Sequence, residues 1–177
     1  TTSRMVIDNQ GNVGIGTTAP THALTIASAT ADAVAASLAF HKSRSGGVIT
    51  TGDDLLSIRG YGHDGTNLDT QGAKIVFDTT GTIAANRIPT EIQFWTAAGS
   101  ANDDISQKMV IDKSGNVGIG TTSPVSKLSV LGESAFAGGA SVGIGYAGTA
   151  APTGGLIIQG NIGIGTTSPQ RLLTVTN

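Results

Sequence analysis

The decapeptide GNVGIGTTSP at residues 115–124 decides the fold, because the chain contains it more than once. GNVGIGTTAP occupies residues 11–20 and GNIGIGTTSP occupies residues 160–169, while a weaker copy, SVGIGYAG, spans 141–148. A motif that recurs within one chain indicates a repeated structural unit. The local structure of one copy and the spacing of all copies are therefore the two clues to the architecture.

The second copy begins with a strand and a turn. MVID at 109–112 is a short apolar and β-branched run, which favours a strand. Asp112 opens and Gly115 closes the tetrapeptide DKSG, a pattern typical of a hairpin turn that ends in a left-handed glycine. The first copy matches the second without a gap in MVID, GNVGIGTT, the proline and the next leucine.

The VGIG tetrapeptide after the turn alternates β-branched residues with glycine. Val117 and Ile119 therefore share one face of a strand, and the two glycines share the other. A glycine face favours close approach by another part of the protein. Pro124 breaks the strand, and Lys127–Val130 starts another. Each copy is thus predicted to be strand, turn, strand, kink and strand.

The spacing of the copies is irregular, since the first apolar residue of the motif stands at positions 13, 117, 142 and 162. A solenoid built by one chain needs a nearly constant period, because each repeat stacks on the next. Modules that close around an axis shared with other copies can instead be separated by inserts of any length. The spacing therefore favours a homotrimer.

The long insert between the first two copies reads as further strands. Ser37–Lys42, Leu55–Tyr61, Ala73–Asp78 and Glu91–Thr96 each alternate at least partly between apolar and polar residues. Alanine-rich Ala27–Ala36 is the one stretch that could form a short helix.

The fold class predicted from these patterns is all-β, with a homotrimeric fibrous structure made of thin interchain shaft modules and a wider β domain. The predicted segments are a shaft module at 1–26, an inserted β domain at 27–104, a shaft module at 105–131, and a thin shaft with two further VGIG-type repeats at 132–177.

The VGIG-type residues are the candidates for the shaft and its axis. We expect the Val and Ile side chains to point to a threefold axis and the glycines to let neighbouring chains approach, although the pattern leaves open which face meets the axis. The set is Val13, Gly14, Ile15, Gly16, Val117, Gly118, Ile119, Gly120, Val142, Ile144, Ile162, Gly163, Ile164 and Gly165.

Composition narrows the classes of function. Charged residues make up 12% of the chain, aromatic residues 4%, and the net charge is −2 without a Lys/Arg cluster, so nucleic acid is not an expected partner. Few large side chains predict a thin core that neighbouring subunits complete. No apolar run is long enough for a membrane span, and the chain has no cysteine. TTSRMVID enters the repeat in mid-pattern, so we expect a piece of a longer chain.

Neither catalytic residues nor a cofactor nor a metal is expected. GNVGIG has the order GxxGxG, and no lysine or amphipathic helix follows, which disfavours a nucleotide loop. GASVG at 139–143 fits GxSxG, but no acid or histidine follows it, as a hydrolase of that type needs. Asp53–Asp54 and Asp103–Asp104 could be paired catalytic carboxylates, but they lie among residues typical of turns, which favours a structural role. The loop at 64–69 misses the spacing of a calcium-binding EF-hand.

Three side chains are candidates for contact with a receptor: Trp95, Tyr61 and His63. Ile92 and Phe94 take one face of their predicted strand, so Trp95 lies on the other face with Gln93. An outward tryptophan can stack on a sugar ring. A large aromatic can equally be buried between subunits, so both readings stay open.

The residues RMVID, GNVGIGTT, the proline and the L-x-V that follow resemble the repeat of phage tail fibres, tail spikes and similar virus-like adhesins. That family often stands upstream of a C-terminal intramolecular chaperone domain. The insert is similar as well, since HKSR, GDDLLSIRGYGHDGT, AKIVFD and the strand before KMVID occur there in this order.

This resemblance implies a structural segment of a trimeric viral tail fibre that carries or spaces host-receptor binding. The alternative is a receptor- or glycan-binding adhesin module of a virus or bacterial surface, and a polysaccharide depolymerase is disfavoured. The implied partners are further copies of the chain, other fibre or virion components and a host cell-surface glycan, without membrane insertion. The implied location is the virion tail fibre, extracellular, or alternatively a cell surface. No catalytic residue carries over.

Overall fold

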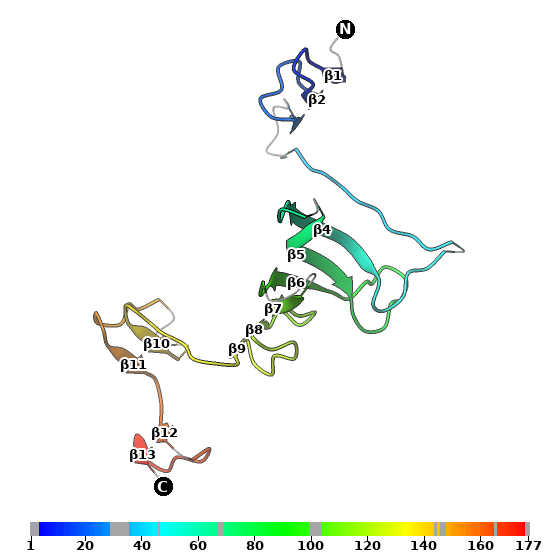
Figure 1. The fold of residues 1–177 in the computed structure, drawn as a ribbon. Helices are drawn as coiled ribbons and strands as arrows, with labels where there is room; N and C mark the ends of the chain where they lie inside the picture. The colour runs from blue at the N-terminus through cyan, green and yellow to red at the C-terminus, as the bar shows by residue number, and fades with distance from the viewer. Residues whose placement is uncertain are drawn as a thin grey trace. The chain divides into compact units, whose positions relative to one another are not determined.

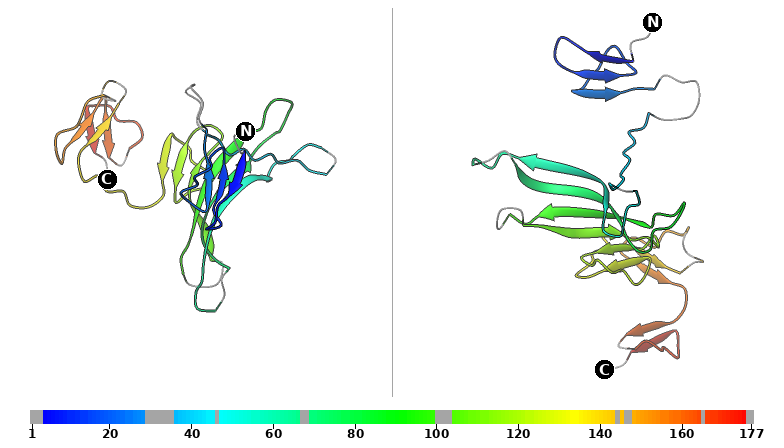
Figure 2. Two further views of the ribbon diagram at one scale, coloured as in Figure 1. Left: turned by 90° about the horizontal axis from the view of Figure 1, so that it is seen from above. Right: turned by 90° about the vertical axis from the view of Figure 1, so that its right-hand side faces the viewer.

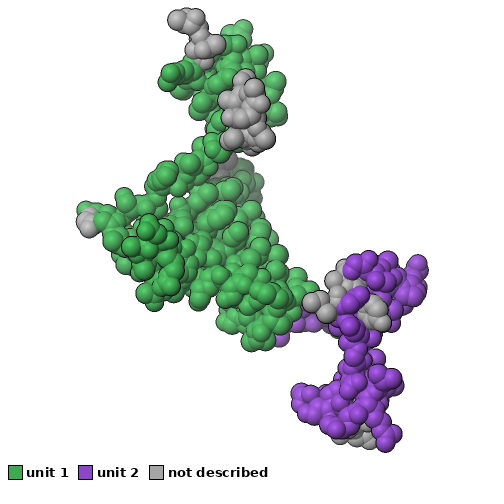
Figure 3. Space-filling view, turned by 180° about the vertical axis from the view of Figure 1, so that it is seen from behind, with its two compact units in different colours: residues 1–129 green, residues 130–177 purple. Residues whose placement is uncertain are grey.

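The computed structural model describes residues 4–28, 36–45, 47–66, 69–99, 104–143, 145, 148–164 and 166–175. Within these ranges every element with defined bounds is a β-strand, which confirms the all-β fold class. The described ranges include no helix of the length and apolar character that crosses a bilayer. The chain divides into two compact units, residues 1–129 and 130–177 (Figure 3).

The first copy of the motif forms a three-stranded sheet of β1 (Met5–Ile7), β2 (Val13–Ile15) and β3 (Leu24–Ile26) (Figure 1). β1 and β2 are antiparallel, whereas β2 and β3 are parallel. The hairpin turn is held by Asp8, whose Oδ1 accepts the backbone N–H groups of Gln10 and Asn12, each at 2.9 Å.

The second copy belongs to a six-stranded sheet, in which the insert supplies the first three strands. Its order is β4-β5-β6-β7-β8-β9, and β4 to β7 lie side by side in both views of Figure 2. The strands are β4 (Asp54–Gly62), β5 (Thr70–Thr79), β6 (Thr90–Ala97), β7 (Ile105–Ile111), β8 (Val117–Ile119) and β9 (Leu128–Val130).

Within this sheet the second copy repeats the geometry of the first. Asp112 Oδ1 accepts the backbone N–H groups of Ser114 and Asn116, each at 2.8 Å, and Gly115 has a φ of 71°. The predicted turn with a left-handed glycine is therefore confirmed. Pairing is antiparallel from β4 to β8. Because the sheet needs β4, β5 and β6 as well as β7, it continues across residue 104, where the segment boundary was expected. The four-segment division stays a prediction.

Three of the four strands expected in the insert are confirmed as β4, β5 and β6. The strand expected at Ser37–Lys42 is wrong, because residues 36–43 have no regular structure. Leu38 and Phe40 are 61% and 55% exposed, so their alternation belongs to a segment without a partner strand. Most of the short helix considered at 27–36 lies outside the described residues.

The third copy departs from the other two. β11 (Leu156–Ile158) pairs in parallel with β10 (Ala140–Val142), and β12 (Ile162–Ile164) pairs in parallel with β13 (Leu173–Val175). The predicted hairpin between β11 and β12 is therefore absent from the described pairings. The connection at 159–161 is shorter than the Asp-led turns of the first two copies and contains no aspartate.

The segment before β4 is closed by a salt bridge between Arg44 and Asp53, and hydrogen bonds join it to Thr79 at the end of β5. Arg44 Nε and Nη2 each donate to Asp53, at 2.7 Å to Oδ2 and Oδ1, and Thr50 N–H donates to the same carboxylate at 2.9 Å. The Asp53 N–H donates to Thr79 Oγ1 at 2.9 Å, and Thr79 is 1% exposed. These contacts hold the pKa of Asp53 well below the ordinary 3.8, chiefly through the Arg44 hydrogen bonds.

We expect Asp53→Asn to lower thermal stability at pH 7 and to reduce its loss in acid. Because the folded pKa is depressed, the carboxylate stabilises the fold fully above about pH 5, and this contribution is lost as the pH falls below 3.8 toward the folded pKa. Thermal unfolding of both proteins between pH 7 and pH 3 measures the effect. Asp69→Asn, at an exposed position, is the control, and an unchanged acid profile in Asp53→Asn contradicts the prediction.

Candidate functional site

The central glycine of each copy makes room for the chain's own backbone. A β-carbon built at Gly14, Gly118 or Gly163 would lie 2.5 to 2.6 Å from the carbonyl oxygen of the threonine three residues later. Real β-carbons do not come so near a carbonyl oxygen, so glycine is required for the turn after the strand to fold back. The close approach expected at these glycines thus comes from the same chain in this structure. Approach by neighbouring chains stays a prediction.

The last glycine of the VGIG tetrapeptide, Gly16 or Gly120, has a different structural role from the one expected. Gly16 and Gly120 follow β2 and β8 rather than lying on a strand face, and their φ angles of 75° and 72° are left-handed. They therefore end the strand and turn the chain. Ile144 and Gly165 lie outside the described residues. Val142 lies in β10 and is 52% exposed.

In the first module, the sheet face opposite to Gly14 carries only apolar side chains. The register of β1, β2 and β3 brings together six side chains on the face that carries Val13 and Ile15. Ile7 and Leu24 are 65% and 54% exposed, although they belong to a paired sheet. The full set is Met5, Ile7, Val13, Ile15, Leu24 and Ile26.

The corresponding face of the six-stranded sheet also carries apolar side chains, across five of its strands. Two cross-strand rows end at the motif residues of β8, and we call these ten side chains the apolar face. One row is Ile58, Ile75, Phe94, Met109 and Ile119; the other is Leu56, Phe77, Ile92, Ile111 and Val117. None of the ten is buried, and Ile119 is 43% exposed.

The opposite face, which we call the polar face, holds a row of buried side chains. Val76, Gln93 and Val110 lie in one cross-strand row and are 2%, 8% and 0% exposed. Val110 also pairs with Gly118, so the turn after β8 covers this end of the row. The chain therefore buries a row of its polar face, whereas the ten residues of the apolar face are half-buried or, at Ile58 and Ile119, exposed.

Charged groups also gather on the polar face. Asp54, Asp78 and Glu91 oppose one another on β4, β5 and β6. Burial raises the pKa of Asp78, and the neighbouring carboxylates of Asp54 and Glu91 raise it further. Gln93 Nε2 donates to Glu91 Oε1 at 2.6 Å and to Asp78 Oδ2 at 3.3 Å. The row is an acidic cluster held by hydrogen bonds from Gln93. Among the described residues, no three histidine or acidic side chains are placed so that they could hold a metal ion.

Trp95 lies on the polar face with Gln93, as its alternation with Phe94 predicts. Its Nε1 donates to Gln93 Oε1 at 2.9 Å, and Lys74 Nζ lies 4.4 Å from the ring centroid. Tyr61 is 54% exposed on β4, and β5 separates that strand from the β6 strand of Trp95. His63 follows β4, where its Nδ1 accepts the Gly65 N–H at 3.3 Å. The structure therefore leaves Trp95 apart from the other two candidates.

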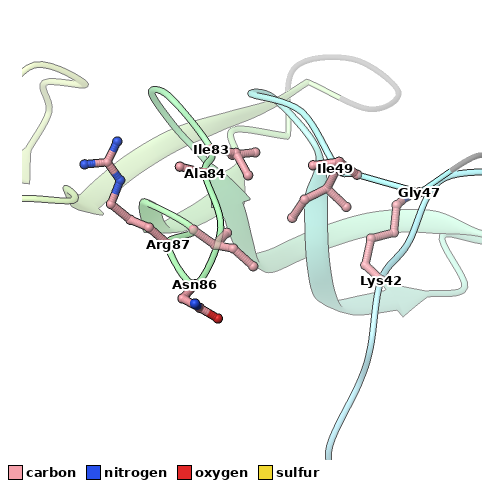
Figure 4. A pocket seen from close by; sticks show the side chains of 9 residues that line it. Lys42, Gly47, Ile49, Ile83, Ala84, Asn86 and Arg87 are labelled. Atoms are coloured by element: carbon pink, nitrogen blue, oxygen red, sulfur yellow. The ribbon is translucent and has the colours of Figure 1, made fainter.

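A cavity of about 430 Å³ lies between residues 42–49 and 83–88, where no sequence motif pointed. Ile49, at its wall, is 7% exposed. The guanidinium of Arg87 is directed away from Ile49 and Lys42 (Figure 4). The lining mixes apolar side chains with Lys42, Asn86 and Arg87, and the three polar groups do not converge on one point (Figure 4).

No model of a known protein family matches this chain, and no curated protein matches it.

Proposed function

We propose that this chain is a non-enzymatic structural segment of a homotrimeric, phage-type viral tail fibre, which carries or spaces host-receptor binding. The observation that supports it best is the apolar face, which recurs at the same motif positions in the first two modules and which the chain itself does not bury. A sheet needs a second layer on its apolar side. Burial of apolar surface contributes about 25 cal/mol per Å², so association would supply what one chain lacks.

Three copies in parallel suit the irregular spacing of the modules. Each module then meets the same module of its neighbours, and the length of an insert does not disturb the match. The axis residues of this proposal are those of the VGIG-type strands, with Val13, Ile15, Val117 and Ile119 facing inward. The proposed location is the virion, with other fibre components as further partners.

The mass of the purified chain in solution tests this proposal. Light scattering coupled to size exclusion is expected to give three times 17.6 kDa at micromolar concentration. A stable monomer would overturn the trimer. Incubation with host capsule is expected to release no reducing sugar, and release would overturn the non-enzymatic assignment.

A second candidate function is binding of an acidic glycan on the polar face. It is favoured by the setting of Trp95, whose indole N–H is held by Gln93 and which has the ammonium group of Lys74 over one face of its ring. Aromatic rings stack on sugars, and a neighbouring cation suits a sugar carboxylate.

Binding of acidic and neutral glycans to three variants tests this site. Trp95→Ala is expected to abolish binding to both kinds, and Lys74→Gln to weaken binding to the acidic kind alone. Thr122→Ala serves as the control, because Thr122 is an exposed loop residue outside the candidate set. Unchanged binding by Trp95→Ala removes the site.

A further inference from the structure

The apolar face extends well beyond the repeat motif into the insert. We infer that the insert's part of this face, on β4, β5 and β6, packs against a second copy of the chain. The interface between copies then runs through the insert and is not confined to the shaft modules. This inference rests on the proposed function and specifies which surface of residues 54–97 the association covers.

The cross-strand register carries the first step. Ile58, Ile75 and Phe94 stand in the same row as Ile119, and β4 to β8 are paired without interruption. Side chains in one row project from the same side of a sheet. An element that covers Ile119 therefore meets a surface that continues through Phe94 to Ile58.

The shape of the face carries the second step. A depression of about 320 Å³ lies at its far end, where Gly60 and Ala73 are small and Ile58, Ile75 and Phe94 form apolar walls. Thr96 completes the lining on this face, and Lys74 and Trp95, whose side chains project from the polar face, border the depression. A hollow of this kind admits a large apolar side chain, which is how well-packed interfaces between proteins are anchored.

The distribution of charged side chains over the two faces favours a second copy as the partner of the apolar face. The ten residues of the apolar face include no ionisable group, so two copies can meet there without burying a charge. On the polar face, by contrast, a copy would bring its own row of Asp54, Asp78 and Glu91 near the same three carboxylates. Like charges in contact disfavour association. Self-association is therefore directed to the apolar face.

The side chains of the apolar face also favour a second copy of the chain over a sugar as the ligand. A glycan needs hydrogen-bonding groups around its ring, and the two rows offer side chains of Leu, Ile, Phe, Met and Val only. A second copy of the chain carries the same apolar rows, which contain no charged side chain. The second copy is thus the occupant that the observations favour.

Thiol labelling of two adjacent positions tests the inference in the full chain, which has no cysteine of its own. Ile58 and Arg59 are both exposed in one chain but project from opposite faces of β4. Ile58→Cys is expected to react with a maleimide at least about tenfold more slowly than Arg59→Cys, because a second copy covers it. Equal rates at the two positions overturn the inference.

A charge variant gives an independent readout. Phe94→Glu is expected to convert the threefold mass to that of one chain, while Ser57→Glu on the polar face keeps it. A wild-type monomer refutes the proposed function itself. A wild-type trimer that persists in Phe94→Glu, with equal labelling at positions 58 and 59, refutes only the extension of the interface into the insert.

Discussion

Gly118→Ala is expected to destabilise the chain by about 2–4 kcal/mol, a large effect for the addition of one methyl group. The new β-carbon would lie 2.5 Å from the Thr121 carbonyl oxygen and 3.0 Å from Val110 Cγ1. Neither neighbour can move freely, because Thr121 stands at the turn after β8 and Val110 is completely buried. The strand or the turn has to shift, which disrupts the packing of the polar face.

Thermal unfolding at a fixed protein concentration measures this effect. Gly62→Ala is the matched control, since Gly62 also lies in a strand and a β-carbon there meets no atom within 4 Å. A Gly118→Ala protein as stable as Gly62→Ala would show that the turn adapts without cost. It would also remove the packing reason for glycine at this position of the motif.

The double variant Ile15→Glu, Ile119→Glu is expected to dissociate the proposed trimer into single chains. Both isoleucines lie on the apolar faces of their modules and are 42% and 43% exposed in one chain, so glutamate is tolerated there by the chain alone. In the assembly each copy would bury two carboxylates without partners, at a cost of several kcal/mol per group.

Light scattering before and after the substitutions provides the readout. Thr18→Glu combined with Thr122→Glu adds the same charge to the same two modules, at exposed loop positions, and is expected to leave the mass unchanged. If the two double variants have equal masses, the motif isoleucines do not lie between copies.

The parts of the fold that depend on neighbouring residues could be predicted from the sequence. The turn at Asp112 and Gly115 was predictable, because a short side-chain acceptor and a left-handed glycine are local requirements. The opposite placement of Phe94 and Trp95 also followed from the two-residue period of a strand. Both features need no knowledge of what the segment packs against.

Features that depend on pairing partners could not be predicted in the same way. Leu38 and Phe40 alternate as a strand does, yet their segment finds no partner backbone among the described residues. The third copy keeps the motif but lacks the Asp-led turn, so β11 pairs with β10 instead. The rows that join Phe94 to Ile119 required the register of β6, β7 and β8, although the alternating Ile92 and Phe94 were a partial signal.

The open apolar face also has a kinetic consequence. If the second layer of each sheet comes from another copy, a newly made chain cannot complete its fold alone. Folding and association are then coupled in one step. The folding rate would then depend on concentration, as for obligate oligomers. Dilution would favour unfolded chains, and crowding of half-formed sheets would favour aggregates. The same ten side chains would thus set both the strength of the fibre and the hazard of its assembly.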